Sequence, residues 1–126
     1  YLRCGGKIDL VSIGSSSTFT SPNYPDNYSD YMQCMWFIQA PEETKILLTF
    51  NDFEMESPDS TGCYDFLEIR PSKCAAATIV PDKLRFCGKA LAPDVDDSPY
   101  ELLSDDNNYV IKMVTDKTDS SRGFNA

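Results

Sequence analysis

Residues 50–70, FNDFEMESPDSTGCYDFLEIR, hold two apolar, β-prone segments on either side of a short polar loop. Four acids stand in this loop and at its edges: Glu54, Glu56, Asp59 and Asp65. A loop of this kind, held by strands, gathers the carboxylate oxygens that Ca²⁺ binds, roughly six to eight at a time. A solvated acidic turn explains the same residues equally well. The stretch alone therefore leaves two interpretations open, a cation site and an ordinary turn.

The length and charge of the chain limit what it does. Its 126 residues are enough for one domain with its own hydrophobic core. The formal net charge of −9 argues against nucleic acid, which needs a basic surface, and favours cations and basic partners. The chain has no histidine, which excludes Ser-His-Asp and Cys-His catalysis and the commonest zinc ligand.

The sequence also lacks the usual membrane and export signals. No apolar run approaches the roughly 18 residues of a membrane span, and no signal peptide opens the chain. We therefore expect a mature or excised piece of a larger protein.

Five cysteines are many for a chain of this length. None forms a CxxC pair, which argues against zinc and thioredoxin-like sites and favours disulfides formed in an oxidising compartment. The odd number leaves one cysteine free, bonded outside the domain, or separated from a partner on a missing segment. Asn27-Tyr28-Ser29 is an N-glycosylation sequon, which fits a secreted glycoprotein.

Short β-prone segments separated by turn residues run along the chain. Residues 32–40 (MQCMWFIQA) are apolar on both faces, with Trp36 on one face and Met35 and Phe37 on the other, which indicates a central strand. An edge strand is expected at 7–13, further strands at 17–20, 45–53, 63–70, 84–88 and 109–115, and the start of another at 123–126. Residues 71–81 fit a helical turn or an irregular segment, and 92–106 a long exposed connection. This pattern predicts an antiparallel β-sandwich or barrel.

Several short motifs, in this order and spacing, resemble one family over nearly the whole chain. They are Cys4-Gly5-Gly6, Thr20-Ser21-Pro22-Asn23-Tyr24-Pro25 with Tyr28, Cys34-Met35-Trp36-Phe37-Ile38, Leu48 with Phe50 and Phe53, Cys63-Tyr64-Asp65-Phe66-Leu67-Glu68-Ile69, Phe86-Cys87-Gly88 and Gly123-Phe124. The sequence is similar to a CUB domain, the extracellular module of complement proteases, tolloid-like proteases and many receptors. The resemblance implies a single all-β domain over residues 1–126, an antiparallel, jelly-roll-like β-sandwich.

The resemblance also implies a disulfide pattern. Cys4 would bond to Cys34, and Cys63 to Cys87, a pairing that four cysteines alone leave undetermined. Cys74 has no place in this pattern. It is either a free or buried thiol or, as we expect, the link to another domain or chain.

Many CUB domains hold Ca²⁺ at one end of the sandwich, and the matching residues are present. The resemblance assigns Glu56, Asp65 and Asp116 as carboxylate ligands, with a carbonyl and a side-chain oxygen from Thr118 and Asp119. These donors and water reach the oxygen number that Ca²⁺ requires. Glu54 and Asp59 are then expected to be solvated acids.

In calcium-binding members of the family, a partner's Lys or Arg pairs with the carboxylates that hold the metal. Here those are Glu56, Asp65 and Asp116, and Tyr28 is expected either to pack on the partner's side chain or to pack within its own proline-rich loop. A sugar on Asn27 would stand beside that approach.

The function implied is a non-enzymatic, secreted, calcium-dependent protein-interaction module. The alternatives are a regulatory or substrate-recognition domain of a secreted protease and a carbohydrate-binding, lectin-like domain.

Overall fold

The computed structural model describes residues 2–58, 60, 62–70, 85–91, 100–104, 106–116 and 120–126. In these ranges the chain forms strands and no helix, so no helix there is long and apolar enough to cross a membrane. The strands are β1 (Leu2–Asp9), β2 (Met32–Gln39), β3 (Leu47–Phe50), β4 (Asp52–Glu54), β5 (Phe66–Arg70), β6 (Arg85–Phe86), β7 (Tyr100–Leu103), β8 (Asn108–Val114) and β9 (Gly123–Asn125). The predicted all-β fold is confirmed.

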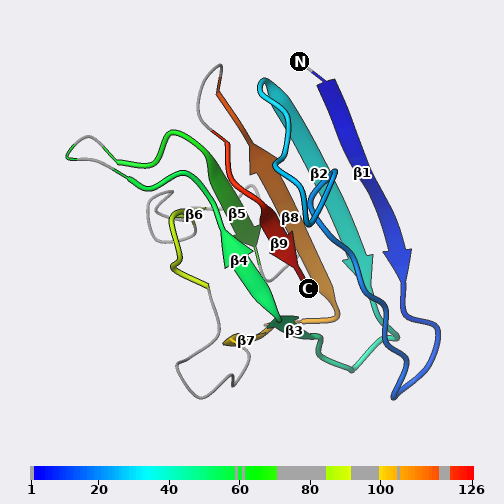
Figure 1. Cartoon of the computed structure of the whole chain (residues 1–126). Coiled ribbons are helices and arrows are strands. Elements are labelled where there is room, and N and C mark those ends of the chain that lie inside the picture. Colours follow the sequence, from blue (N-terminus) through cyan, green and yellow to red (C-terminus); the bar gives the residue numbers. More distant parts are fainter. Residues whose placement is uncertain are drawn as a thin grey trace.

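One layer is a five-stranded sheet in the order β1-β2-β8-β5-β6 (Figure 1). β2 lies between β1 and β8, as its apolar sequence predicts. β1 is the edge strand, although it covers Leu2–Asp9 rather than residues 7–13, and it runs parallel to β2 while the other pairs in the sheet are antiparallel. Gly5 allows this close pairing, because its φ is 102° and a Cβ there would overlap the carbonyl oxygen of Met35.

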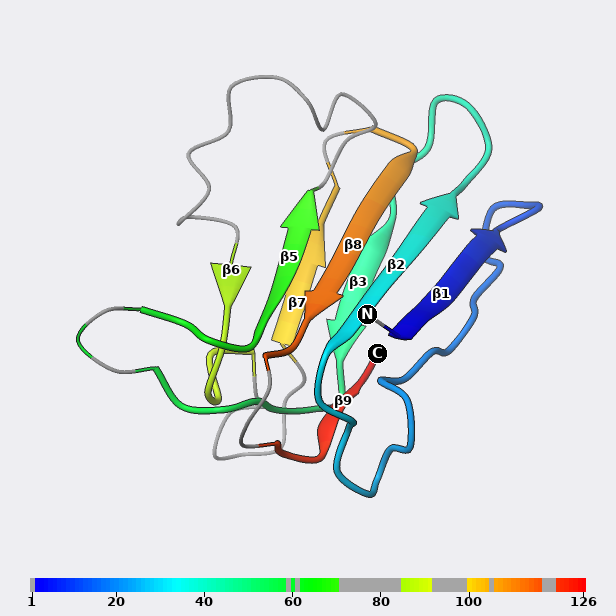
Figure 2. The ribbon, with the colours of Figure 1, turned by 90° about the horizontal axis from the view of Figure 1, so that it is seen from above.

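The second layer is built from two antiparallel pairs, β3 with β7 and β4 with β9 (Figure 2). Residues 19 and 20 extend the second pair, because Thr20 forms a bridge to Asn125. β7 corrects the expectation that residues 92–106 are only a connection. Its four residues, YELL, stand in a sequence rich in Pro, Asp and Ser that reads as loop, and they form a strand by pairing with β3.

The inner faces of the two layers enclose the core. Trp36, Phe124 and Phe19 pack in tilted and edge-to-face contacts with ring centroids 5.4–5.5 Å apart, and Phe50 continues the cluster 5.9 Å from Phe124. The sequence predicts that both faces of β2 are buried, but the face that points away from the core is not. Phe37 is 48% exposed, so β2 is buried on only one of its two apolar faces.

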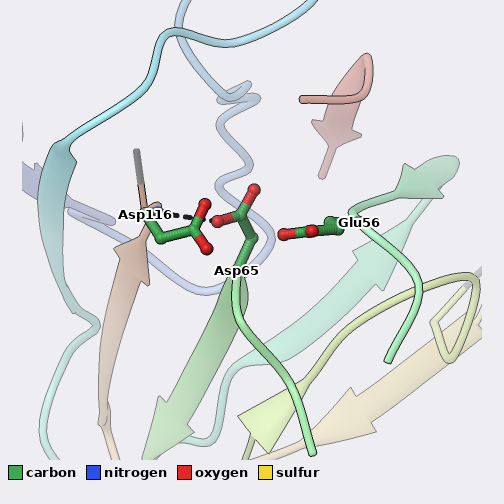
Figure 3. A group of neighbouring side chains, drawn as sticks. All are labelled: Glu56, Asp65 and Asp116. Carbon is green, nitrogen blue, oxygen red and sulfur yellow. Dashed lines mark hydrogen bonds between the residues drawn. The ribbon is translucent and has the colours of Figure 1, made fainter. Parts of the chain in front are cut away.

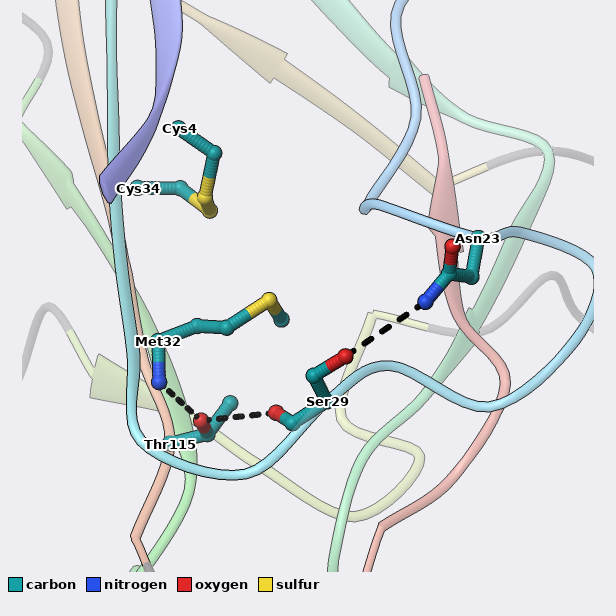
Figure 4. The surroundings of a disulfide bond; sticks show 6 residues. All are labelled: Cys4, Asn23, Ser29, Met32, Cys34 and Thr115. Atoms are coloured by element: carbon teal, nitrogen blue, oxygen red, sulfur yellow. Dashed lines mark hydrogen bonds between the residues drawn. A yellow bond between two sulfur atoms is a disulfide. The ribbon is translucent and has the colours of Figure 1, made fainter. Parts of the chain in front are cut away.

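Both predicted disulfides are formed. Cys4–Cys34 joins two residues that face each other across β1 and β2. Cys63–Cys87 joins the loop that precedes β5 to the residue that follows β6. Near the first bridge, Thr115 fastens the end of β8 to neighbouring segments (Figure 4). Its hydroxyl accepts from the Met32 N–H at 2.8 Å and donates to the Ser29 carbonyl at 3.0 Å.

Candidate metal site

Glu56, Asp65 and Asp116 converge at one end of the sandwich (Figure 3). One carboxylate oxygen from each residue lies within 4.8 Å of the other two. Glu56 follows β4, Asp65 precedes β5, and Asp116 follows β8. Three segments that are far apart in the sequence therefore bring their acids to one point, as the resemblance predicts.

Strand pairing places the two aspartates. Phe66 of β5 lies opposite Val114 of β8, so Asp65, one residue before Phe66, and Asp116, two residues after Val114, stand at the same end of the sheet. The Asp116 N–H donates to Asp65 Oδ1 at 2.7 Å. The pairing of β5 with β8 and this hydrogen bond together hold the start of β5 next to the end of β8.

Hydrogen bonds to Gly88, the residue after Cys87, hold the segment that carries Glu56. The Met55 N–H donates to the Gly88 carbonyl at 2.8 Å, and the Gly88 N–H donates to the Glu56 carbonyl at 3.1 Å. Since Cys87 is bonded to Cys63, two residues before Asp65, the disulfide and these hydrogen bonds tie the segments of Glu56 and Asp65 to each other.

Tyr28 is part of the interior of the site rather than its surface. Its side chain is 2% exposed, its hydroxyl donates to Asp65 Oδ2 at 2.8 Å, and that hydroxyl accepts from the Glu56 N–H at 3.1 Å. Burial and the bond to Asp65 raise the pKa of Tyr28 far above its ordinary value. In this conformation Tyr28 packs inside the domain, and its ring has no accessible face for a partner's side chain.

Asp65 is the most deeply buried of the three acids, at 0% exposure. Burial raises its pKa from the ordinary value of 3.8 to about 6, because an ionised carboxylate loses its hydration there. The hydrogen bonds from Asp116 N–H and Tyr28 oppose this rise, while the negative charge of Asp116 adds to it. The site is therefore short of positive charge at neutral pH.

Two further acids, Asp52 and Glu54, are paired with an arginine. Arg122 binds Asp52 through two bonds of 2.7 Å and Glu54 through a third of 2.7 Å. The guanidinium holds the pKa of Asp52 below its usual range, and Tyr24 donates to the same carboxylate at 2.7 Å. Glu54 is thus a partner in an ion-pair network, which corrects the expectation of a solvated acid.

Four residues singled out in the sequence lie outside the described part of the chain: Asp59, Cys74, Thr118 and Asp119. Asn27 is described and exposed, and the adjacent Tyr28 is buried, so the two neighbouring side chains occupy different environments.

Tyr31 lies near the cluster without any sequence pattern that singles it out. It is 52% exposed, and its N–H donates to the Asp116 carbonyl at 2.9 Å. This backbone hydrogen bond places Tyr31, an exposed residue, next to Asp116 in the structure. No sequence signal marks it, because its position depends on a loop with a positive φ at Tyr31 itself (54°).

The geometry suits a hard cation. Two oxygens that bind one Ca²⁺ at about 2.3–2.6 Å from it lie at most about 5 Å apart, and the three carboxylates meet that condition. All three offer oxygen, the ligand atom that Ca²⁺ and Mg²⁺ prefer, and none is the sulfur or nitrogen that zinc prefers.

A family model described as "CUB domain" matches residues 4–126. The chain belongs to the CUB domain family. The CUB domain is a non-catalytic module, so the domain itself is not an enzyme.

Known proteins agree with this assignment over nearly the whole chain. The chain is 34% identical to the dorsal-ventral patterning protein tolloid of Drosophila melanogaster over 98% of its own length and 10% of tolloid. It is 33% identical to rat cubilin over 99% of its own length and 3% of cubilin. The chain therefore spans a small part of these relatives.

Two solved structures share the fold. The full extracellular region of zebrafish Gpr126/Adgrg6 matches with a TM-score of 0.69 and 28% identity, over 94% of this chain and 14% of that one. A MASP-1 CUB2 domain, solved bound to Ca²⁺, matches with a TM-score of 0.67 and 25% identity, over 91% of this chain and 92% of that domain.

Proposed function

We propose that this CUB domain is an extracellular, calcium-dependent protein-interaction module that binds a Lys or Arg side chain of its partner. The observation that carries the proposal is the convergence of Glu56, Asp65 and Asp116 within 4.8 Å. Three carboxylates in such proximity repel one another, and burial of Asp65 makes its ionisation still less favourable. A divalent cation removes both penalties at once.

Ca²⁺ is the cation that the site fits best. It accepts carboxylates in irregular arrangements, whereas Mg²⁺ demands near-octahedral geometry and keeps several waters. Thr118 and Asp119 are the proposed remaining protein ligands. They come two and three residues after Asp116 in the sequence and precede Ser121, whose carbonyl accepts from the Tyr28 N–H at 3.0 Å. We expect a dissociation constant of roughly 0.1–1 mM, typical of extracellular modules.

The accessible residues of the site favour a basic partner. Asp65 and Tyr28 are buried, whereas Glu56 and Asp116 are only partly buried. A metal ion fixes these two carboxylates, and their remaining lone pairs accept charge-assisted hydrogen bonds from an ammonium or guanidinium group. Tyr31, exposed beside Asp116, takes the role first assigned to Tyr28 and packs on the partner's aliphatic stem.

The compartment of the domain and the protein to which it belongs are also part of the proposal. Two disulfides and an exposed sequon at Asn27 fit an oxidising, extracellular compartment, and a neighbour in structure is an extracellular region. Residues 1–126 would be one module of a longer chain, since the relatives are far longer than the match. If that chain carries a protease domain, this module would position the protease on its substrate.

A binding experiment on lysine surfaces tests the function. The domain is passed over immobilised polylysine and over fully acetylated polylysine, with 5 mM CaCl₂ or with EGTA. We expect Ca²⁺ to increase binding to polylysine, and Asp116→Asn to abolish the increase. Attraction by net charge alone has the opposite sign, because Ca²⁺ makes the domain less negative. Binding that falls or stays level when Ca²⁺ is added would refute the proposal.

A further inference from the structure

The outer face of the five-stranded sheet, which points away from the core, gathers basic side chains. Along β2 and β8 every second residue is buried, and the residues between them point outward. The strand registers extend this face over β1, β5 and β6. Its basic residues are Arg3, Lys7, Arg70, Arg85 and Lys112, and its acids are Asp9 and Glu68. We call this surface the basic face.

The charge of the basic face is opposite to that of the chain. Five of the 11 basic residues of the sequence lie on it, but, as far as the structure describes the chain, only two of the 20 acids do. The face therefore has a formal charge of +3 on a chain of −9. Charges farther away than about 8 Å are screened at 0.15 M ionic strength, so a ligand on this face is attracted by the local cations.

The buried acid of the face does not cancel the cations around it. Glu68 is 5% exposed and forms an ion pair with Arg70 at 2.7 Å. The strand registers place Lys112 and Arg85 opposite Glu68 on the two neighbouring strands. Three cations thus surround one carboxylate, which leaves positive charge for an anion from outside.

The other acid, Asp9, holds Lys7 only weakly. The Lys7 Nζ and the Asp9 Oδ1 are 3.5 Å apart, and both side chains are more than half exposed. Ion pairs at such positions contribute little free energy, because water and salt screen them. An incoming carboxylate therefore competes with Asp9 for Lys7 at small cost.

An apolar hollow of about 380 Å³ lies among these cations. Lys7, Phe37 and Val110 line it from three neighbouring strands, in the order β1, β2 and β8. Phe37 is 48% exposed although it stands within β2. Lys112 stands two residues after Val110 on β8, opposite Met35 of β2. The hollow therefore offers an apolar floor with a lysine on β1 and another on β8.

We propose that the basic face binds an acidic peptide segment of another protein that carries one apolar side chain. The apolar side chain enters the hollow against Phe37 and Val110, and carboxylates beside it pair with Lys7 and Lys112. Charge complementarity selects an anionic ligand, and the apolar floor selects a peptide over a sulfated glycan, which has no apolar side chain to bury. This site does not involve the carboxylate cluster, so the inference stands apart from the proposed calcium-dependent function.

The test is an NMR titration of the ¹⁵N-labelled 126-residue chain with the peptide acetyl-Asp-Glu-Leu-Glu-Asp-amide, in EGTA and 0.15 M NaCl. We expect saturable shifts at the amides of Phe37, Val110 and Lys112, and no shifts at Asp65 and Asp116. Net charge does not produce this result, because an acidic chain and an acidic peptide repel each other overall. Absence of saturable shifts at the first three amides at several millimolar peptide would overturn the proposal.

Three control ligands separate charge from apolar contact. Acetyl-Asp-Glu-Ser-Glu-Asp-amide keeps the charge without the leucine, and acetyl-Asn-Gln-Leu-Gln-Asn-amide keeps the leucine without the charge. We expect each to bind at least about fivefold more weakly than the first peptide. Equal affinity of the three peptides would refute the site. A heparin tetrasaccharide that shifts the same amides and binds more tightly than the first peptide would make the face a glycan site, which also refutes the proposal.

Substitutions in the protein complete the test. Lys7→Gln and Lys112→Gln are each expected to weaken peptide binding by about two- to fivefold, and Phe37→Thr by about fivefold. Lys45→Gln removes an exposed cation just before β3, outside the basic face, and is expected to change nothing. Unchanged affinity in both Lys7→Gln and Lys112→Gln would contradict the proposal.

Sedimentation of the chain without peptide tests a second copy of the chain as the occupant. We expect a monomer at the concentrations of the titration. A dimer that Phe37→Thr abolishes would assign the basic face to contacts between copies and would overturn the proposal.

Discussion

Replacing Asp65 by Asn is expected to stabilise the metal-free domain at neutral pH. Burial raises the pKa of Asp65 to about 6 in the folded state, against an ordinary 3.8. Each pKa unit corresponds to about 1.4 kcal/mol, so the ionised carboxylate costs the folded state up to about 3 kcal/mol at pH 7.5. Asparagine has almost the same shape, still accepts from the Asp116 N–H, and carries no charge.

The sign of the pH dependence follows from the raised pKa. Between pH 4 and pH 6 the folded protein holds a proton on Asp65 that the unfolded chain has lost, so stability falls as pH rises through this range. We therefore expect D65N to match the wild type near pH 4 and to exceed it by up to about 3 kcal/mol at pH 7.5. The exposed Asp26 supplies a matched control, and D26N is expected to follow the wild type throughout.

The assay is urea unfolding in EGTA, followed by the fluorescence of Trp36, the single tryptophan, which is 6% exposed. Calcium narrows the difference: at ten times its dissociation constant it stabilises the wild type by about 1.4 kcal/mol, and D65N by less. Parallel pH profiles for wild type and D65N in EGTA would show that Asp65 carries no burial penalty and would refute the reasoning.

Two further substitutions test the fold around the site by urea unfolding. Arg122→Gln is expected to cost roughly 1 kcal/mol at pH 7, because it breaks the bonds to Asp52 and Glu54 at a partly exposed position. That cost should shrink in acid, where Asp52, whose pKa is depressed, finally protonates; a constant difference down to pH 2 would contradict this account. Gly5→Ala is expected to cost at least about 3 kcal/mol, because the added Cβ would overlap the Met35 carbonyl oxygen. Gly6 also has a positive φ (159°), but a Cβ there meets nothing within 4 Å, so Gly6→Ala is expected to cost less. Equal stability of the two alanine variants would rule out close packing of β1 on β2 at Gly5.

The strands and the acidic cluster were the features most accessible from the sequence. Alternation of apolar residues located β2, β3, β5 and β8 to within a few residues, because β2, β3 and β8 each bury one face against the other layer, while in β5 Leu67, Glu68 and Ile69 are all buried. The grouping of Asp116 with residues of the 50–70 stretch came from the family resemblance, since no local pattern relates segments 51 residues apart.

Other features depended on contacts that local sequence does not encode. Arg122 lies 68 and 70 positions from its partners Glu54 and Asp52, so no local sequence pattern predicts the ion-pair network. Tyr28 belongs to a loop rich in proline and polar residues, where no periodicity indicates burial. Phe37 sits on an apolar strand face that only one layer covers, and only the arrangement of the second layer decides which face is buried.

The central claim is that Glu56, Asp65 and Asp116 hold one calcium ion. A calcium titration of the ¹⁵N-labelled domain, followed by NMR, tests it most directly, with D116N and D26N measured alongside. The account predicts one saturable site of roughly 0.1–1 mM, with the largest shifts at the amides of these three residues and of Tyr31. It also predicts that D116N weakens binding at least about tenfold while D26N leaves it unchanged. Absence of saturable shifts at several millimolar Ca²⁺, or equal affinity in D116N, would contradict the claim.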